Sequence, residues 1–183
     1  MNTITRMYKS GFTLVETLIA ITVLLIAIVA PMTLAQEGIL AARLAEDQIV
    51  AFYMAQEGVE LVRNIRDENK YRGLDMLSGQ LNECIVTVDS TEPGCYIDVT
   101  NVGPDVSFST QPCSSGGCRV MRTDGTIYAY TAAGFENTKF TRNIRAWYIP
   151  GTSNNEIRVE VTVTWPFRQS TRTYTLRSNM TNW

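Results

Sequence analysis

The feature that most constrains the fold is an apolar run that extends from Phe12 to Ala35. A helix of roughly 20 apolar residues is enough to cross the hydrocarbon core of a bilayer, so this run predicts a membrane-spanning helix. Its only formal charge is Glu16. Because a carboxylate at membrane depth is costly unless a partner compensates it, Glu16 is a candidate functional residue.

The segment that precedes the run, residues 1–11, contains Arg6 and Lys9 and no acidic residue. Positive charge beside an apolar span favours the cytoplasmic side, so the rest of the chain is expected outside. A cleaved secretory signal would have a shorter apolar core that ends in a small-residue site. Here the run continues past Pro31 to Ala35, which favours a retained anchor, although "PMTLA" leaves an unconventional signal peptide open.

A second helical segment is expected over residues 36–68. Apolar residues recur there at steps of three and four, which is typical of an amphipathic helix; they are Leu40, Leu44, Phe52, Ala55, Val59 and Val62. Pro31 lacks a backbone donor, so it is expected to kink or loosen the helix. Gly38 and Gly58 each weaken a helix by about 1 kcal/mol relative to Ala without forbidding it.

Residues 69–183 predict a β-rich head. Short β-rich pieces ("CIVTVD", "CYIDVT", "CRVMRT", "IYAYT") are separated by turn-forming residues. Clearer strands are expected at 140–149, 156–165 and 171–178. In the middle strand, apolar and polar residues alternate from Ile157 to Trp165, which is typical of an antiparallel sheet covered on one face. We expect the amphipathic helix to form that cover, which makes the fold α+β.

The head contains four cysteines: Cys84, Cys95, Cys113 and Cys118. Their even number and loop setting favour disulfides in an exported domain. "CSSGGC" closes a short flexible loop, so Cys113–Cys118 is the pair expected first, which leaves Cys84–Cys95. The other two connectivities and free thiols stay open. A zinc site is a further alternative, although the chain has no Cys-x-x-Cys spacing and no histidine.

The composition argues against catalysis. Histidine is absent, which removes the commonest general base and metal ligand. The sequence shows no Gly-rich phosphate loop and no Ser-His-Asp set, so we expect no enzyme, no cofactor and no metal. The net charge of −2 gives little reason to expect nucleic acid. A basic stripe could still bind DNA electrostatically, but basic residues on the solvated face of a sheet are the simpler interpretation; they are Arg119, Arg122, Lys139, Arg142, Arg145, Arg158, Arg168, Arg172 and Arg177.

The segment "KSGFTLVETLIAITVLLIAIVAP" resembles the start of the type IV pilins and the related pseudopilins. The signal of that family is a basic leader that ends in Gly, then an aromatic residue or Met, a Thr-Leu-x-Glu core and an apolar helix. Here these elements are Gly11, Phe12 and "TLVE", which ends at Glu16. Two softer stretches, "AFYMAQEGVELVRNIRDENK" and "VTVTWPFRQSTRTYTLRSNMTNW", are similar to minor pilins and type II secretion pseudopilins.

This resemblance implies roles for particular residues. A prepilin peptidase in the membrane would cut between Gly11 and Phe12 and methylate the new amino group of Phe12. That amine could pair with Glu16 of a subunit already assembled, which would favour docking and fix the axial register. An intramolecular pair and a Glu16 that stays protonated in lipid are the alternatives. Pro31 and Gly38 would mark where the helix loosens on assembly, or an ordinary kink.

The sequence therefore predicts a structural subunit, a minor pilin, of a type IV pilus-like filament. A compact, abundant major pilin is the runner-up, because copy number cannot be read from sequence. A pseudopilin of a type II secretion system is the alternative, and a bitopic membrane protein that never assembles is the third hypothesis. The expected segments are the leader 1–11, the membrane and assembly segment 12–35, the amphipathic segment 36–68 and the head 69–183. The expected partners are the prepilin peptidase, other pilin subunits and an inner-membrane assembly platform. The head would lie outside the cytoplasmic membrane before assembly, and in an extracellular pilus or envelope pseudopilus afterwards.

Overall fold

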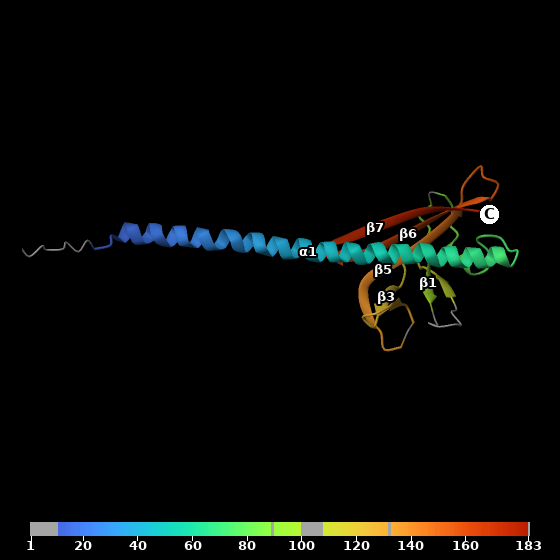
Figure 1. Cartoon of the computed structure of the whole chain (residues 1–183), viewed down its shortest axis with the longest axis horizontal. Coiled ribbons are helices and arrows are strands. Elements are labelled where there is room, and N and C mark those ends of the chain that lie inside the picture. The colour runs from blue at the N-terminus through green and yellow to red at the C-terminus, as the bar shows by residue number, and fades with distance from the viewer. Residues whose placement is uncertain (1–10, 89, 100–107, 132, 183) are drawn as a thin grey trace, which may run out of the picture. The chain divides into compact units, whose positions relative to one another are not determined.

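The computed structural model describes residues 11–88, 90–99, 108–131 and 133–182 (Figure 1). The chain divides into two compact units, Met1–Ala45 and Glu46–Trp183. Helix α1, Leu14–Tyr71, contributes to both. The described residues of the second unit also form the 3-10 helix η1, Gly79–Cys84, and seven strands in one sheet. The predicted α+β class, with a long N-terminal helix and an antiparallel sheet, is confirmed.

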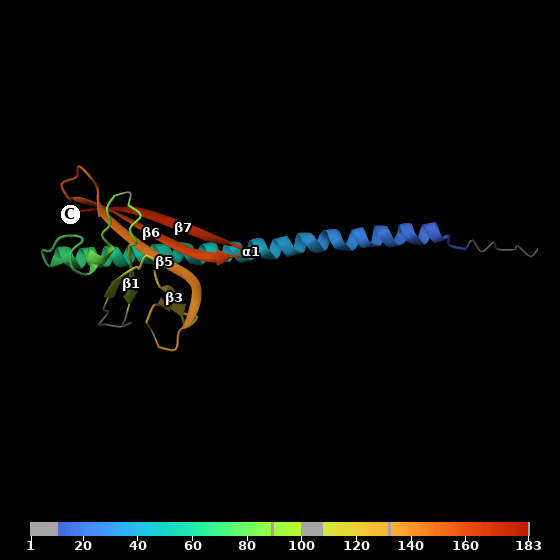
Figure 2. The ribbon, with the colours of Figure 1, turned by 180° about the vertical axis from the view of Figure 1, so that it is seen from behind.

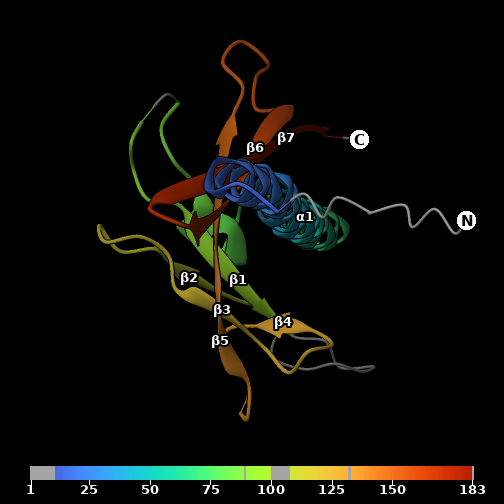
Figure 3. The ribbon, with the colours of Figure 1, turned by 90° about the vertical axis from the view of Figure 1, so that its left-hand side faces the viewer.

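The sheet is built around its longest strand, β5. The strands are β1 Cys95–Val99, β2 Phe108–Pro112, β3 Val120–Thr123, β4 Tyr128–Ala129, β5 Glu136–Tyr148, β6 Glu156–Phe167 and β7 Ser170–Thr181. One edge of β5 pairs with β6, which pairs in turn with β7, and all the ladders are antiparallel. The other edge of β5 takes β3 and β1, with β4 and β2 beyond them. Figure 3 shows β1 to β4 grouped apart from β6 and β7.

Strands β5, β6 and β7 correspond to the three clearest predicted strands, although β5 begins earlier and β6 and β7 end later than expected. The prediction of a strand from Cys84 onward is wrong over the described residues 84–88, which form no strand. Cys84 ends η1, and only Ile85 forms a bridge, to Ala146. The backbone N–H of Thr87 then donates to the Glu92 carboxylate at 3.0 Å, so a turn replaces the ladder.

The core of the second unit lies between α1 and one face of the sheet. Figures 1 and 2 show, from opposite sides, the second half of α1 running beside β5, β6 and β7. The predicted alternation in β6 is confirmed, because Ile157, Val159, Val161, Val163 and Trp165 are all buried. Burial of such side chains is the main favourable contribution to folding. The buried side chains of α1 include Ala51, Met54, Ala55, Val59, Val62 and Ile65.

This buried face of α1 differs in part from the predicted apolar stripe. Leu40 and Leu44 are only half-buried. Phe52 is 36% exposed and does not belong to the buried core. Its ring packs against Tyr174 of β7, with the ring centroids 5.8 Å apart. Gly58, which the sequence marked only as a weak helix former, is buried in the contact between α1 and the sheet, next to Val161 and Arg142.

Gly58→Ala is expected to lower the free energy of unfolding by about 1–3 kcal/mol, because overpacking outweighs the gain in helix propensity. An added Cβ would lie 2.9 Å from Cγ1 of Val161 and 3.3 Å from Cδ of Arg142. Gly38 is the matched control, since an added Cβ there meets nothing within 4 Å. Denaturant unfolding of the full chain in detergent measures both variants, and a Gly58→Ala midpoint at or above that of the parent would contradict the expectation.

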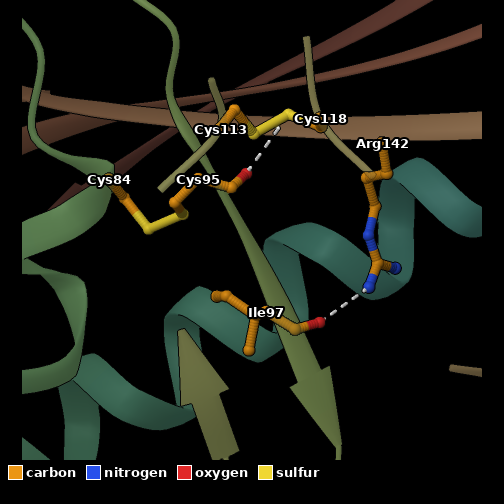
Figure 4. Close-up of a disulfide and its surroundings, with 6 residues drawn as sticks. All are labelled: Cys84, Cys95, Ile97, Cys113, Cys118 and Arg142. Carbon is orange, nitrogen blue, oxygen red and sulfur yellow. Dashed lines mark hydrogen bonds between the residues drawn. A yellow bond between two sulfur atoms is a disulfide. The ribbon is translucent and has the colours of Figure 1, made fainter. Parts of the chain in front are cut away.

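Arg142, one of the basic residues that the sequence placed on a solvated face, is buried in this core. Its guanidinium donates to the backbone oxygens of Met54 in α1 at 3.2 Å and Ile97 in β1 at 3.4 Å. It also forms an ion pair with Glu57 at 3.1 Å and lies over the ring of Tyr130. Arg142 therefore links α1, β1 and β5. Figure 4 shows the hydrogen bond from its guanidinium to the carbonyl oxygen of Ile97.

All four cysteines form disulfides, in the pairs that the sequence favoured first. Cys84–Cys95 joins the end of η1 to β1, and Cys113–Cys118 joins the segments that follow β2 and precede β3. Figure 4 shows the two bridges side by side, with Sγ of Cys118 4.0 Å from the carbonyl oxygen of Cys95. The free-thiol and zinc alternatives therefore do not hold for these residues.

Candidate functional site

The candidate site begins with the residues just before α1. Gly11, Phe12 and Thr13 lie outside any helix or strand and are exposed. Phe12 is 76% exposed, and an added Cβ at Gly11 would meet nothing within 4 Å. Among the described residues, nothing therefore covers the Gly11–Phe12 peptide bond. Arg6 and Lys9 of the expected leader lie outside the described residues.

Thr13 is the N-cap of α1. Its Oγ1 accepts a hydrogen bond from the backbone N–H of Glu16 at 3.3 Å, and its carbonyl accepts the N–H of Thr17 at 3.2 Å. A cap of this kind satisfies a donor that the first turn of a helix leaves free. The sequence interpretation missed this role. The signal for it was present, because "TLVE" has the Thr-x-x-Glu spacing of a capping box before an apolar run.

Glu16 consequently lies in the first turn of α1 and on its surface. A negative charge is favourable there because of the helix dipole. Among the residues that the structure describes, its carboxylate has no hydrogen-bond or ion-pair partner. The neighbouring side chains on α1 are apolar and exposed, including Val15 at 63% and Ile19 at 58%. The carboxylate is thus available to a partner from outside the described chain.

The other polar side chains of this helical segment are satisfied internally. The hydroxyl groups of Thr17, Thr22 and Thr33 each donate to the carbonyl oxygen three residues earlier, at 2.8 Å. Internal pairing of this kind is what a non-aqueous surrounding requires. Large apolar side chains cover the remaining surface, among them Leu18, Ile21, Leu25, Ile28, Val29 and Leu34. By length and composition, α1 is able to cross a membrane.

The residues expected to loosen the helix lie within α1. The helix is continuous through Pro31 and Gly38. Because Pro31 has no N–H, the carbonyl of Ala27 lacks its usual helical donor, and Gly38 has open space where a side chain would be. Both residues therefore reduce the stability of the helix without ending it. Whether the segment loosens on assembly stays a prediction.

The structure thus places the predicted cleavage and register residues on one short segment, whereas the cysteines lie in the head. Gly11, Phe12 and Glu16 lie within six consecutive positions, at the exposed start of an apolar helix. Cys84, Cys95, Cys113 and Cys118 shape the sheet instead. Chemically, the segment presents one carboxylate on an otherwise apolar surface, and such an arrangement suits pairing with a cation in an apolar environment.

The comparisons with known proteins single out this same segment. The family model described as "Prokaryotic N-terminal methylation motif" matches residues 6–30. This motif is characteristic of type IV pilins and pseudopilins, so the resemblance stated for the N-terminal segment is confirmed. Comparison of the chain with curated proteins and with solved structures gave no match. The matched range contains the predicted cleavage site, Thr13 and Glu16.

Proposed function

We propose that this chain is a minor pilin, a structural subunit of a type IV pilus-like filament. The prepilin peptidase cuts it between Gly11 and Phe12 and methylates the new amino group of Phe12. The subunit then assembles through residues 12–35 with the matching helices of other pilin subunits, at an inner-membrane assembly platform. The observation that carries this proposal is the uncompensated carboxylate of Glu16 on an exposed apolar helix, inside the matched motif.

The apolar surface supports a membrane location followed by assembly. None of the residues in the 18-residue window of α1 that is apolar enough to span a membrane is buried. Leaving this surface in water would cost about 25 cal/mol per Å² of apolar area. A bilayer removes that cost before assembly, and a bundle of like helices removes it after the subunit leaves the bilayer. The head would face outward from the cytoplasmic membrane throughout.

Glu16 gives the assembly step its selectivity. Cleavage would convert the amide of Phe12 into an amine, which is positive at neutral pH. Leaving either that amine or the Glu16 carboxylate alone in an apolar bundle costs several kcal/mol, and pairing them across two subunits offsets much of that cost. Only helices in the correct axial register bring the two groups together. The pair therefore selects the register more than it adds to the raw stability.

A pseudopilin of a type II secretion system is the alternative to a minor pilin. The two disulfides of the head suit a domain outside the cytoplasm, which holds for a pilus and for an envelope pseudopilus. The methylation motif itself supports either kind of subunit. Detection of the chain in filaments sheared from the cell surface would favour the pilus, and its retention in the envelope of secreting cells would favour the pseudopilin. Pilin-like subunits are structural, so no catalysis is proposed.

The first experiment is the mass of the N-terminal peptide of the protein isolated from its native membrane. A peptide that begins at N-methylated Phe12 is the expected result. An intact leader in cells with an active prepilin peptidase would instead indicate a bitopic protein that does not assemble. A peptide that begins near Ala35 would indicate a secreted protein. Either of these results would remove the role assigned to Glu16.

A further inference from the structure

The head has a polar crevice on the face of the sheet that points away from α1. Its volume is about 300 Å³, and its lining residues are Ser90, Arg145, Trp147, Arg158, Glu160 and Arg177. Side chains alternate between the faces of a strand. Because Ile144 and Val159 point into the core, Arg145 and Glu160 belong to the opposite face. The crevice is therefore separate from the helix that the proposed filament uses.

A fixed row of charges forms the floor of the crevice. Glu160 of β6 lies opposite Arg145 of β5 and opposite Arg177 of β7 in the strand register. Its Oε1 accepts Nη1 of Arg145 at 3.2 Å, and its Oε2 accepts Nε of Arg177 at 2.7 Å. The Glu160 side chain is only 10% exposed. Because this one buried carboxylate holds both guanidinium groups, their orientation is set before any ligand arrives.

The lining residues of the crevice carry an excess of positive charge, while Glu156 on the same face of β6 accepts Nδ2 of Asn179 at 3.0 Å. Three guanidinium groups face the single carboxylate of Glu160. The third, that of Arg158, donates through Nε to Oδ1 of Asn179 at 2.9 Å, and its terminal nitrogens have no partner among the described residues. The nearby Glu92 carboxylate accepts the N–H of Thr87 at 3.0 Å and the hydroxyl of Ser90 at 3.2 Å. These two bonds lower the pKa of Glu92 and keep the carboxylate on its own loop.

The surface beside the charged row offers hydroxyl groups and an amide. Thr162 and Thr175 are neighbours across β6 and β7 on the same face, with their hydroxyl oxygens 3.3 Å apart. On the other side of the charged row, Asn179 lies opposite Arg158. Hydroxyls and amides both donate and accept hydrogen bonds. The surroundings of the crevice therefore match a ligand that carries several hydroxyl groups as well as a negative charge.

We propose that this crevice binds an anionic sugar residue. The carboxylate or phosphate group of the sugar contacts the terminal nitrogens of Arg158 and the guanidinium of Arg177. The hydroxyl groups of the sugar contact Thr162 and Thr175 beside the crevice. Arginine forks suit both kinds of anion. The proposal concerns the head alone and does not depend on cleavage or filament assembly.

A nucleic acid fits the same residues less well. Binding to a nucleic-acid backbone needs a track of basic side chains that can each neutralise a phosphate. Here Arg142 is buried in the core, and Lys139 forms an ion pair with Asp47 at 2.6 Å. These two residues therefore cannot join the crevice residues in such a track, and the crevice suits a single anionic group.

The test is titration calorimetry of the full chain in detergent micelles. The probes are glucuronic acid, which carries a carboxylate, glucose 6-phosphate, which carries a phosphate, and neutral glucose. We expect millimolar binding of at least one anionic sugar, weakened by added salt, and no binding of glucose. Arg158→Gln should weaken that binding by about tenfold, the effect of losing one charge-assisted contact. Arg172→Gln is the matched control, because Arg172 is exposed on β7 and does not line the crevice.

The outcomes separate clearly. Binding of glucuronic acid alone, or of glucose 6-phosphate alone, supports the proposal and identifies the anionic group. Binding of neither sugar overturns it, and so does equal binding by the parent and by Arg158→Gln with an unchanged unfolding midpoint. Binding of a short DNA duplex in place of both sugars also overturns it, since the ligand would then be a nucleic acid.

Discussion

Glu16→Ala is expected to be cleaved and methylated like the parent chain but to be depleted from filaments by at least about tenfold, since an uncompensated charge in an apolar bundle costs roughly 3–5 kcal/mol. In the parent, the Glu16 carboxylate has no partner among the described residues, so it is available to the amine of another subunit. In the variant, that amine would enter the bundle alone. The measurement compares the chain in sheared filaments with the chain in membranes, with the N-terminal peptide mass as a check on cleavage.

Two further variants separate charge from other effects at this position. Glu16→Gln keeps the side-chain size and the backbone N–H that donates to Thr13, so it removes the charge alone. It should be depleted as strongly as Glu16→Ala. Thr22→Val is the control for the apolar surface, because the hydroxyl of Thr22 bonds only to the carbonyl of Ile19, and it should assemble normally. Normal incorporation of Glu16→Gln would refute the pairing mechanism.

Gly94→Ala is expected to destabilise the head by more than about 4 kcal/mol, which is enough to leave a marginally stable domain largely unfolded. An added Cβ would lie 2.0 Å from the backbone oxygen of Ile144 and 2.5 Å from Oδ1 of Asn143. Ile144 cannot withdraw easily, because it is paired with Val161 on the other edge of β5. The carbonyl of Gly94 also accepts the N–H of Cys113 at 2.9 Å. Unfolding midpoints and resistance to protease measure the effect.

Gly116→Ala is the matched control for this prediction. Gly116 lies in the nearby loop between Cys113 and Cys118, and an added Cβ there meets only Oγ of Ser114 at 3.7 Å, an ordinary contact. The free energy of unfolding of Gly116→Ala should stay within about 0.5 kcal/mol of the parent value, as is usual for surface substitutions. If Gly94→Ala behaved in the same way, β1 and β5 would have to separate at this point without loss of the fold.

The sequence predicted the elements whose signals are local. The apolar run, the methylation segment and the alternation of Ile157 to Trp165 are each carried by neighbouring residues. The β2 strand was missed, because "FSTQP" has a single large apolar residue and no alternation to distinguish it from a loop. The stretch that begins at Cys84 has residues typical of a strand. It forms no ladder, because Cys84 belongs to η1 and the backbone N–H of Thr87 donates to the Glu92 carboxylate.

The sequence did not predict contacts between residues that lie far apart along the chain. Nothing near Arg142 indicates that its guanidinium reaches Met54, a residue 88 positions earlier. Gly94 looks like any loop glycine until β5 is placed against it. The crevice likewise depends on the register that sets Glu160 between Arg145 and Arg177. In the assembly segment, the helix cap at Thr13 was the one feature that the sequence interpretation missed although a local signal, the Thr-x-x-Glu spacing, indicated it.

The disulfide pattern has a consequence for the order in which the head matures. Each cysteine is bonded to its nearest neighbour along the chain, across 11 positions for Cys84–Cys95 and 5 positions for Cys113–Cys118. A head that crosses the membrane in sequence order presents Cys84 and Cys95 to the oxidant before Cys113 arrives. Oxidation as the chain emerges then yields the native pairs directly. Such a head would need an oxidase for its maturation but no isomerase to correct the result.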